Sequence, residues 1–328
     1  MKIIWLPLEN LEERYTADWA KWFPQEFRRL GVDFITIEGE PLTSHIEIGR
    51  FLDVFGTIYY KSTQIAKVAE LLRAGVIKSG DIIFDADLWR PGLEAIPYMT
   101  QLAGLDIKVV GILHAGTYDP YDFTAQAGLE SWGEKIENGW LSFIDMIFVG
   151  STFHKELLKE KRDVRCPIEV TGLPFYGANL RRQFSIIKKE PIVVFPHRLD
   201  PEKNPYLFDE LKLAVSSGQF IKTVDVWGGN KAAYYELLSK STVVVSFADQ
   251  ETFGYAIAEA IALGCTPVLP RKLSYSEIYP QEYLFDSFEE AVELTRFYLG
   301  NPKPCPQVLN QFEGSIERMV HHIMRYIT

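Results

Sequence analysis

Residues 243–259, VVVSFADQETFGYAIAE, decide the fold class of this chain. The run Val243–Phe247 is apolar enough to be a buried strand, and a polar loop that contains Glu251 follows it. Gly254 then permits the tight backbone turn from which a helix can begin near Tyr255. Strand, loop and helix in this order are the repeating unit of a parallel α/β sheet.

The same alternation of strand and helix patterns extends along the chain in both directions from this segment. Helices are predicted at Ala17–Leu30, which ends at Gly31, and at Ser62–Arg73, which ends just before Gly75. Strands are predicted at Ile3–Leu6, Phe34–Ile37, Asp81–Phe84, Lys108–Leu113, Met146–Val149, Ile192–Phe195, Thr223–Trp227, Val243–Phe247 and Thr266–Leu269. The chain is therefore expected to form doubly wound α/β units.

A glycine- and proline-rich interruption at Thr171–Gly177 predicts a boundary between two such units. We expect domains at 1–177 and 178–305 and a C-terminal segment at 306–328. Ser315–Ile327 has the spacing of an amphipathic helix. Its apolar stripe consists of Ile316, Met319, Val320, Ile323, Met324 and Ile327.

Composition excludes several classes of protein. The chain has 328 residues, 47% hydrophobic and 24% charged, which is typical of a globular protein and not of a disordered or collagen-like one. Its three cysteines, Cys166, Cys265 and Cys305, fit neither a disulfide framework nor a zinc site. We expect no signal peptide, no membrane span and a cytoplasmic location.

The net charge of −10 argues against broad, non-specific binding to nucleic acid. One window departs from this balance, since residues 155–189 contain nine basic and four acidic residues. Such a run is commonly a solvated helix face followed by a charged linker. It is also what a landing site for a polyanion requires.

In parallel sheets, ligands bind beyond the carboxyl ends of the strands. The loop after Ile192–Phe195 carries Arg198 and Lys203, which can hold a diphosphate from two directions. An isolated pair of this kind is more often simply solvated. Gly228, directly after the predicted strand Thr223–Trp227, is a further candidate for donor binding.

The segment after Val243–Phe247 strengthens this assignment. The amides of Thr252, Phe253 and Gly254 lie at the start of a helix, where the dipole and the unpaired N–H groups favour a pyrophosphate. Glu259 lies eight positions after Glu251, roughly 12 Å along the helix by rise. One carboxylate can therefore take sugar hydroxyls while the other takes ribose hydroxyls. Glu259 can equally be an ordinary helical glutamate, but it borders the apolar run Ala260–Leu263 and so needs a partner.

Taken together, these segments resemble the retaining nucleotide-sugar glycosyltransferases of GT-B fold, the family 4-like enzymes. The family's hallmark is a glutamate pair with seven intervening residues, followed by a Gly-Thr-Pro-Val-like entry to a strand. Here these are Glu251, Glu259 and Leu263–Val268, while Arg198 and Lys203 match the family's diphosphate clamp. The matching segments of the first domain are Asp81–Trp89, Val109–His114 and Asp145–Ser151.

The resemblance implies an α/β fold of GT-B type, with two Rossmann-like domains facing across a cleft and the C-terminal helix packing back on the first domain. It implies a UDP- or GDP-sugar donor, no required cofactor or metal, and retention of anomeric configuration. The resemblance assigns roles to individual residues. The catalytic groups are His114, Arg198, Lys203 and Glu251, and the donor-binding groups are Glu259, Thr252, Phe253, Gly254 and Gly228. The residues on the acceptor side are Asp87, Trp89 and Asp119. His114 would face the donor sugar. Asp85-Ala86-Asp87 can alternatively be a metal–nucleotide motif.

The acceptor is suggested by the loop His197–Pro205, which is similar to that of the tRNA-queuosine mannosyltransferases, and by a chain length similar to that of phage enzymes that glucosylate modified DNA bases. A hydroxyl of a modified nucleobase in DNA or tRNA is therefore the expected acceptor, reached through the window 155–189. The alternatives are a glycan or lipid acceptor in envelope biosynthesis, a nucleotide-sugar epimerase of the same fold, and a non-catalytic sugar-nucleotide sensor. Pro7–Glu13 stands where the family has a glycine-rich loop, and Phe195–His197 where it has small residues.

Overall fold

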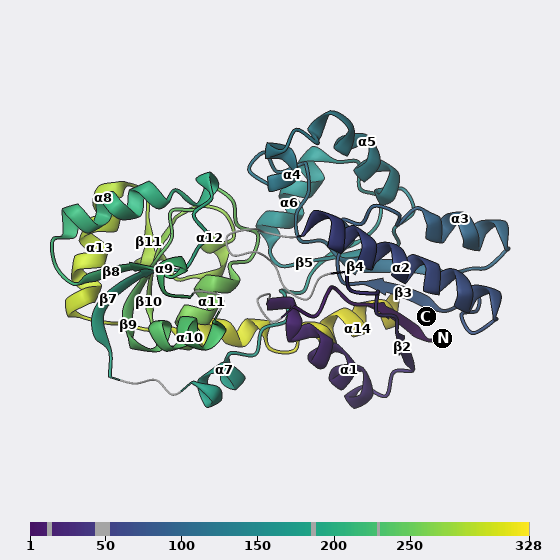
Figure 1. The fold of residues 1–328 in the computed structure, drawn as a ribbon, viewed down its shortest axis with the longest axis horizontal. Helices are drawn as coiled ribbons and strands as arrows, with labels where there is room; N and C mark the ends of the chain where they lie inside the picture. Colours follow the sequence, from purple (N-terminus) through teal and green to yellow (C-terminus); the bar gives the residue numbers. More distant parts are fainter. Residues whose placement is uncertain (12–14, 43–52, 185–187, 228–229, 328) are drawn as a thin grey trace. The chain divides into compact units, whose positions relative to one another are not determined.

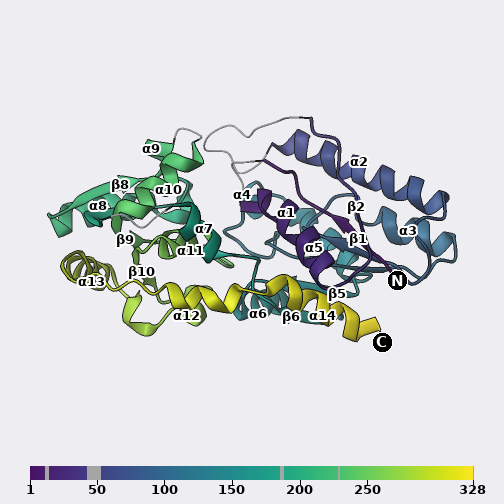
Figure 2. The same cartoon turned by 90° about the horizontal axis from the view of Figure 1, so that it is seen from below.

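The computed structural model describes residues 1–11, 15–42, 53–184, 188–227 and 230–327, and it divides into two compact units (Figures 1 and 2). Unit 1 comprises Met1–Gly150, His154–Leu173 and Gly314–Thr328, and unit 2 comprises Ser151–Phe153 and Pro174–Glu313.

Compared with the domains expected at 1–177 and 178–305, this division places three further short segments in unit 2, namely Ser151–Phe153, Pro174–Gly177 and residues 306–313. Tyr255 donates its hydroxyl to the carbonyl of Pro174 at 2.8 Å. Near the other end of unit 2, the ring of Phe312 packs edge-on against that of Phe253, with centroids 4.6 Å apart.

Unit 1 is built on a six-stranded parallel sheet. Its strands lie in the order β2-β1-β3-β4-β5-β6, so that β3 and β4 are neighbours in the middle of the sheet. The strands are β1 (Ile3–Leu6), β2 (Phe34–Thr36), β3 (Ile82–Asp85), β4 (Lys108–Ile112), β5 (Met146–Val149) and β6 (Ile168–Val170). Five of them were predicted from sequence; β6, with one buried residue in three, lacks a strong apolar pattern.

Helices cover both faces of this sheet because successive strand residues point to opposite sides. On one face the indole of Trp5 stacks on Phe23 of α1 at 4.1 Å and meets the ring of Phe84 edge-on. On the other face Ile4 and Ile83 belong to a buried cluster that includes Val68, Ile96 and Trp140. The helices are α1 (Trp19–Arg29), α2 (Val54–Arg73), α3 (Ala95–Leu102), α4 (Phe123–Gln126), α5 (Glu130–Leu141), α6 (Thr152–Lys161) and α14 (Ser315–Ile327), with a 3-10 turn, η1, at Tyr15–Ala17.

The C-terminal helix α14 packs on unit 1 beside α1 (Figures 1 and 2). Its side chains Ile316, Met319, Val320 and Ile323 are buried, whereas Met324 is 37% exposed. The side chain of Ile327 lies outside the described residues. Arg318 ties the helix to the sheet by donating to the carbonyl of Thr171 at 2.8 Å. No helix in the described ranges combines the length and the apolar character needed to cross a bilayer.

Unit 2 is built on a five-stranded parallel sheet in the order β11-β10-β9-β7-β8. Its strands are β7 (Glu190–Phe195), β8 (Gln219–Lys222), β9 (Ser241–Val245), β10 (Thr266–Pro270) and β11 (Leu284–Phe285). Figure 1 shows this sheet with α8 (Pro205–Val215) and α13 (Phe288–Gly300) on one face and α10 (Lys231–Lys240) and α11 (Tyr255–Ala262) on the other. The remaining elements are α7 (Gly177–Gln183), α9 (Val224–Trp227), α12 (Tyr275–Ile278), η2 (Pro201–Lys203), η3 (Gln281–Tyr283) and η4 (Pro306–Phe312).

The predicted strand Thr223–Trp227 is wrong. The strand is β8, Gln219–Lys222, and Val224–Trp227 forms the short helix α9. β8 pairs with β7 in a register that sets Lys222 opposite Phe195, the last residue of β7, so the ladder stops before the predicted segment begins. Because β8 is an edge strand, its residues are exposed or only half-buried and give little apolar signal. The predicted fold class, α/β with doubly wound parallel sheets, is confirmed.

Candidate functional site

Two loops meet at the carboxyl edge of the unit 2 sheet, where β7 and β9 are neighbours. The amide of Asp249, after β9, donates to the carbonyl of Glu202, after β7, at 2.7 Å. Lys203 Nζ donates to the backbone carbonyl of Gln250 and, at 3.2 Å, to its side-chain oxygen. The same ammonium lies 3.6 Å from Oε2 of Glu251. Two of the predicted catalytic groups, Lys203 and Glu251, are thus brought into contact.

Arg198, on the same loop as Lys203, is in a different environment. Its guanidinium pairs with Asp200 at 3.1 Å and with Glu202 at 3.4 Å, and its side chain is 31% exposed. The side chain of Lys203 is only 7% exposed. The loop therefore carries one buried cation and one half-buried cation.

The turn into α11 requires glycine. Gly254 has φ of 91°, in the left-handed region that only glycine adopts freely, and a β-carbon there would lie 3.2 Å from Cε1 of Tyr275. The N–H groups of the first helical turn have no acceptor within the helix, so this end favours an anion. The side chain of Phe253 is buried against Tyr255 and Phe312, so only its backbone faces a ligand here. Thr252 accepts a hydrogen bond from Ser151 Oγ at its carbonyl, 2.7 Å away.

Glu259 lies on α11 and is held by two neighbouring tyrosines of α10. Tyr234 donates its hydroxyl to Oε2 at 2.9 Å, and Tyr235 donates to Oε1 at 2.7 Å. Burial, followed by the charge of Glu259, raises the pKa of Tyr234 well above its ordinary value, so the phenol remains a donor. The sequence indicated that a glutamate beside a buried face needs a partner, but nothing in it pointed to this tyrosine pair. Gly228, the remaining predicted donor-binding residue, lies outside the described residues.

A buried histidine, His197, directly follows Pro196 just after the end of β7, and no role was predicted for it from the sequence. His197 Nε2 is 2.8 Å from Oγ of Ser246, which in turn lies 3.1 Å from the hydroxyl of Tyr275. Burial, with the nearby cations Lys203 and Arg198, lowers the pKa of His197 well below its ordinary value. The imidazole is therefore neutral and adds no charge to the site.

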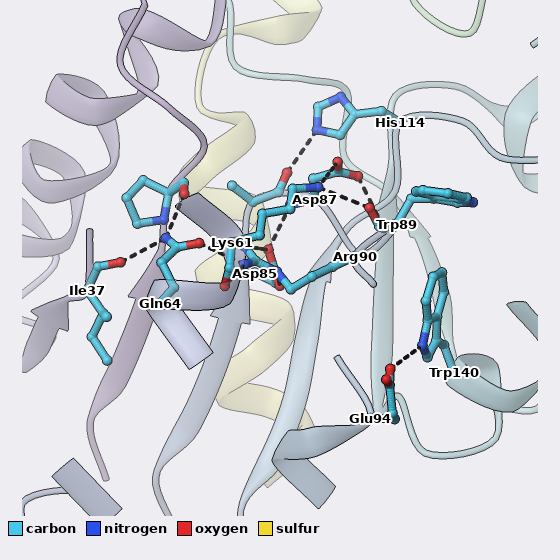
Figure 3. A network of polar contacts seen from close by, with 12 residues as sticks. Ile37, Lys61, Gln64, Asp85, Asp87, Trp89, Arg90, Glu94, His114 and Trp140 are labelled. Atoms are coloured by element: carbon cyan, nitrogen blue, oxygen red, sulfur yellow. Dashed lines mark hydrogen bonds and ion pairs between the residues drawn. The ribbon is translucent and has the colours of Figure 1, made fainter. Parts of the chain in front are cut away.

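In unit 1, His114 follows β4 and lies beside the loop after β3 (Figure 3). Its Nε2 is 2.8 Å from the carbonyl of Ala86, so this nitrogen carries the proton, and its ring stacks on Trp19 at 5.4 Å. Burial lowers the pKa of His114, and the charge of Asp87 only partly opposes this. His114 is accordingly a neutral, oriented imidazole.

Asp87 pairs with a buried lysine on α2 (Figure 3). Lys61 Nζ lies 2.8 Å from Oδ2 of Asp87 and 3.0 Å from the carbonyl of Trp89, to both of which it donates. Burial by itself would raise the pKa of Asp87, but Lys61 and then His114 outweigh it and lower the pKa. The sequence offered no signal for Lys61, because a cation on a helix is ordinary until its burial is known.

The other aspartate of the Asp-x-Asp segment also has its own cation. Asp85 and Arg90 are both fully buried and form a two-pronged ion pair, with Nη2 to Oδ1 at 2.9 Å, and Arg90 donates to Gln64 at 2.7 Å (Figure 3). The two carboxylates are thus committed to different partners. This arrangement does not present them together to a metal ion, which the alternative interpretation of Asp85-Ala86-Asp87 requires. Within the described ranges, no cluster of three or more His, Cys, Asp or Glu side chains is arranged to hold a metal.

The other two residues predicted on the acceptor side have structural partners in unit 1. Trp89 donates its indole N–H to Glu137 at 2.8 Å. Its ring meets that of Trp140 edge-on (Figure 3). Asp119 is buried and accepts the backbone N–H of Tyr121 at 3.0 Å. Both side chains therefore help to hold the loops after β3 and β4.

Many cations of the basic window 155–189 have partners within the chain. The window is divided between the two units, and two of its cations are used internally. Arg162 pairs with the buried Glu137 at 2.8 Å, and Lys189 donates to the carbonyls of Leu238 and Leu263, at the ends of α10 and α11. Three further cations pair with acidic neighbours in the window: Lys159 with Glu156, Lys161 with Glu160, and Arg165 with Asp163. The charge count in the sequence overstates the charge offered to a polyanion.

Comparison with known proteins identifies glycosyltransferases as relatives. No protein-family model matches the chain. A tRNA-queuosine alpha-mannosyltransferase of Drosophila melanogaster is 31% identical over 146 residues, 37% of this chain and 39% of that protein. An alpha-1,6-glucosyltransferase of Actinobacillus pleuropneumoniae serotype 7 (strain AP76) is 24% identical over 186 residues, 56% of this chain and 54% of that protein. Both matches span less than two thirds of the relative's length.

Solved structures resemble the chain over almost its whole length. Sucrose-phosphate synthase from Thermosynechococcus elongatus superposes with a TM-score of 0.64 at 13% identity, covering 99% of this chain and 98% of that one. An alpha-glucosyltransferase in complex with UDP-glucose and DNA containing an abasic site superposes with a TM-score of 0.55 at 13% identity, covering 100% and 98%. At such identities the likeness establishes the fold. The chain has the GT-B fold, which it shares with nucleotide-sugar glycosyltransferases.

Proposed function

We propose that this chain is a glycosyltransferase that moves a sugar from a UDP- or GDP-sugar to an acceptor hydroxyl. The observation that carries the proposal is the contact between Lys203 and Glu251 beside the glycine turn that opens α11. A cation, a carboxylate and a helix N-terminus at one sheet edge can bind a pyrophosphate and the sugar attached to it. Relatives that are glycosyltransferases support the same activity.

In this proposal the protein accelerates the reaction mainly by electrostatic stabilisation of the transition state. Departure of the nucleoside diphosphate develops negative charge, which Lys203, Arg198 and the amides near Gly254 stabilise. Glu251 orients the sugar through its hydroxyls, and Glu259 takes the ribose. His114 is assigned to catalysis by the family resemblance, which also implies retention of configuration. No metal is needed, because the cations and the helix dipole supply the positive charge.

For the acceptor we propose a hydroxyl of a modified nucleobase in tRNA or DNA. The support is the partial match to a tRNA-queuosine alpha-mannosyltransferase and the likeness in fold to an alpha-glucosyltransferase solved with DNA. The basic window 155–189 adds little, since most of its cations are paired or buried. A glycan acceptor is the second candidate, favoured by the match to an alpha-1,6-glucosyltransferase.

The test is a product assay with the full chain. UDP- and GDP-sugars are incubated with unmodified and modified tRNA, with DNA carrying hydroxymethylated bases, and with glycan acceptors, and the products are identified by mass. We expect nucleoside diphosphate to be released only when an acceptor is present, and Arg198→Ala to reduce this release by orders of magnitude. Conversion of the donor sugar without an acceptor would instead indicate an epimerase, and tight donor binding without turnover a sensor.

Salt dependence separates the two acceptor classes. Phosphate contacts release counterions, so affinity for DNA or RNA should fall steeply as salt rises. A flat salt profile, or transfer to glycans only, would overturn the nucleic-acid proposal and leave the transferase proposal intact.

A further inference from the structure

Tyr234 and Tyr235, adjacent residues of α10, bind the two different oxygens of one carboxylate. Tyr234 reaches Oε2 of Glu259 at 2.9 Å and Tyr235 reaches Oε1 at 2.7 Å. The tyrosines are 9% and 7% exposed, respectively, so these hydrogen bonds are largely shielded from water. Hydrogen bonds to an ionised acceptor are roughly twice as strong as neutral ones. The orientation of the Glu259 carboxylate is therefore defined from the α10 side.

The tyrosines are themselves fixed by packing. Their rings contact each other with centroids 5.2 Å apart, and the ring of Tyr235 also packs on Phe184 at 4.9 Å. The ammonium of Lys231 lies over the ring of Tyr235 at 5.8 Å. The side chain of Asn230 caps α10 by accepting the N–H groups of Ala232 and Ala233. The phenols thus project from a capped helix whose tyrosine rings are packed.

We propose that Tyr234 and Tyr235 are positioning residues that pre-orient Glu259 for the two hydroxyls of the donor's ribose, and that they thereby set selectivity for ribonucleotides over nucleotides without these hydroxyls. The inference rests on the proposed function, which assigns the ribose to Glu259. A carboxylate offers about four acceptor positions, and each phenol uses one position on a different oxygen. A ribose presents two donors, which the same two oxygens can accept. A carboxylate already held in place loses less freedom when a ligand binds.

The opposite arrangement would make the phenols competitors of the ribose, which would have to displace them from Glu259. The two possibilities differ in the sign of one effect. Removing a positioning hydroxyl weakens the binding of a ribonucleotide, whereas removing a competing hydroxyl strengthens it.

The experiment is calorimetric titration of the full chain with UDP, GDP and ADP, followed by titration of the tightest binder's 2′,3′-dideoxy analogue. The dissociation constant of the dideoxy analogue divided by that of the ribonucleotide measures the contribution of the ribose hydroxyls to binding. For Tyr234→Phe and Tyr235→Phe we expect this ratio to fall about tenfold each, because each variant removes one of the two hydrogen bonds that orient the Glu259 carboxylate toward the ribose. Affinity for the dideoxy analogue should change by less than about twofold. In turnover, the KM for the donor should rise while kcat changes little.

Tyr298→Phe is the matched control. Tyr298 is also buried in unit 2 and donates to the carbonyl of Glu282 at 3.0 Å, so its loss costs a phenolic hydrogen bond unrelated to Glu259. Its ratio should remain that of the wild type. Thermal unfolding verifies that each variant is folded, and either single variant is sufficient because the two act on different oxygens.

An unchanged or increased ratio in the folded variants, with nucleotide binding retained, would overturn the inference and leave the proposed function standing. If the wild type binds neither UDP nor GDP, the proposed function itself fails and the inference falls with it.

Discussion

Replacing Lys203 with Met tests the assignment of this side chain to the donor diphosphate. Its ammonium donates to Gln250 and lies 3.6 Å from Glu251, and the two charged side chains are only 7% and 19% exposed. Breaking a fully buried pair costs ~3–5 kcal/mol, so for this partly solvated one we expect a loss of about 2 kcal/mol. For a unit of this size that corresponds to a melting temperature lower by roughly 4–8 °C. Loss of a preorganised cation at a developing anion should reduce kcat by a further ~10²–10³.

The assay combines thermal unfolding with measurement of nucleoside diphosphate release, and Lys222→Met is the matched control. Lys222 also forms an ion pair in unit 2, at 2.8 Å from Asp209, but Asp209 is 61% exposed. An exposed pair of this kind contributes ~0–1 kcal/mol, so the control should keep both its melting temperature and its turnover. A Lys203→Met enzyme with lowered stability but near-normal turnover would refute the diphosphate assignment and leave Lys203 a structural role.

Three further predictions concern the turn, the buried ion pair and acid stability. Gly254→Ala should lower the free energy of unfolding by ~1–2 kcal/mol and weaken donor binding, because φ is 91° and the added carbon would lie 3.2 Å from Tyr275. Thermal unfolding measures the first effect and donor titration the second. Arg90→Met should destabilise unit 1 by ~3–5 kcal/mol, because it leaves the fully buried carboxylate of Asp85 without its cation; a wild-type circular dichroism melt would contradict this. Burial lowers the pKa of His154 to about 3, so as the pH falls the unfolded chain takes up this proton before the folded one does. The free energy of unfolding therefore decreases as the pH drops below about 6.5, and at pH 5 His154 alone should account for a loss of about 2 kcal/mol. Denaturant unfolding of His154→Gln should show a smaller loss between neutral pH and pH 5.

Most of the fold could be predicted from periodicity. Strands such as Ile3–Leu6 and Met146–Val149 are buried on both faces, so they appear in the sequence as uninterrupted apolar runs. Edge strands lack this signal. Gln219–Lys222 pairs on one side only and is half-buried, and the alternating pattern of Thr223–Trp227 beside it was misleading.

The sequence could predict those site residues whose role depends on their place along the chain. Lys203, Glu251 and Gly254 stand at strand ends and helix starts, which are positions that sequence order marks directly. Partners from distant segments could not be found in this way. Lys61 and Asp87 are 26 positions apart and Tyr234 and Glu259 are 25 apart, and each pair meets only because two elements pack together.

Sequence by itself determined the class of fold and the loops that carry the candidate chemistry, because the pattern of apolar and polar residues along each element decides which of its sides is buried. Tertiary structure alone decided how those groups are partnered. It showed that both aspartates of Asp85-Ala86-Asp87 face separate cations, that most cations of the window 155–189 are paired or buried, and that two tyrosines hold Glu259. The physical reason is that the effect of a charge depends on its distance to other charges and on its exposure to water, and neither quantity is defined until the chain has folded.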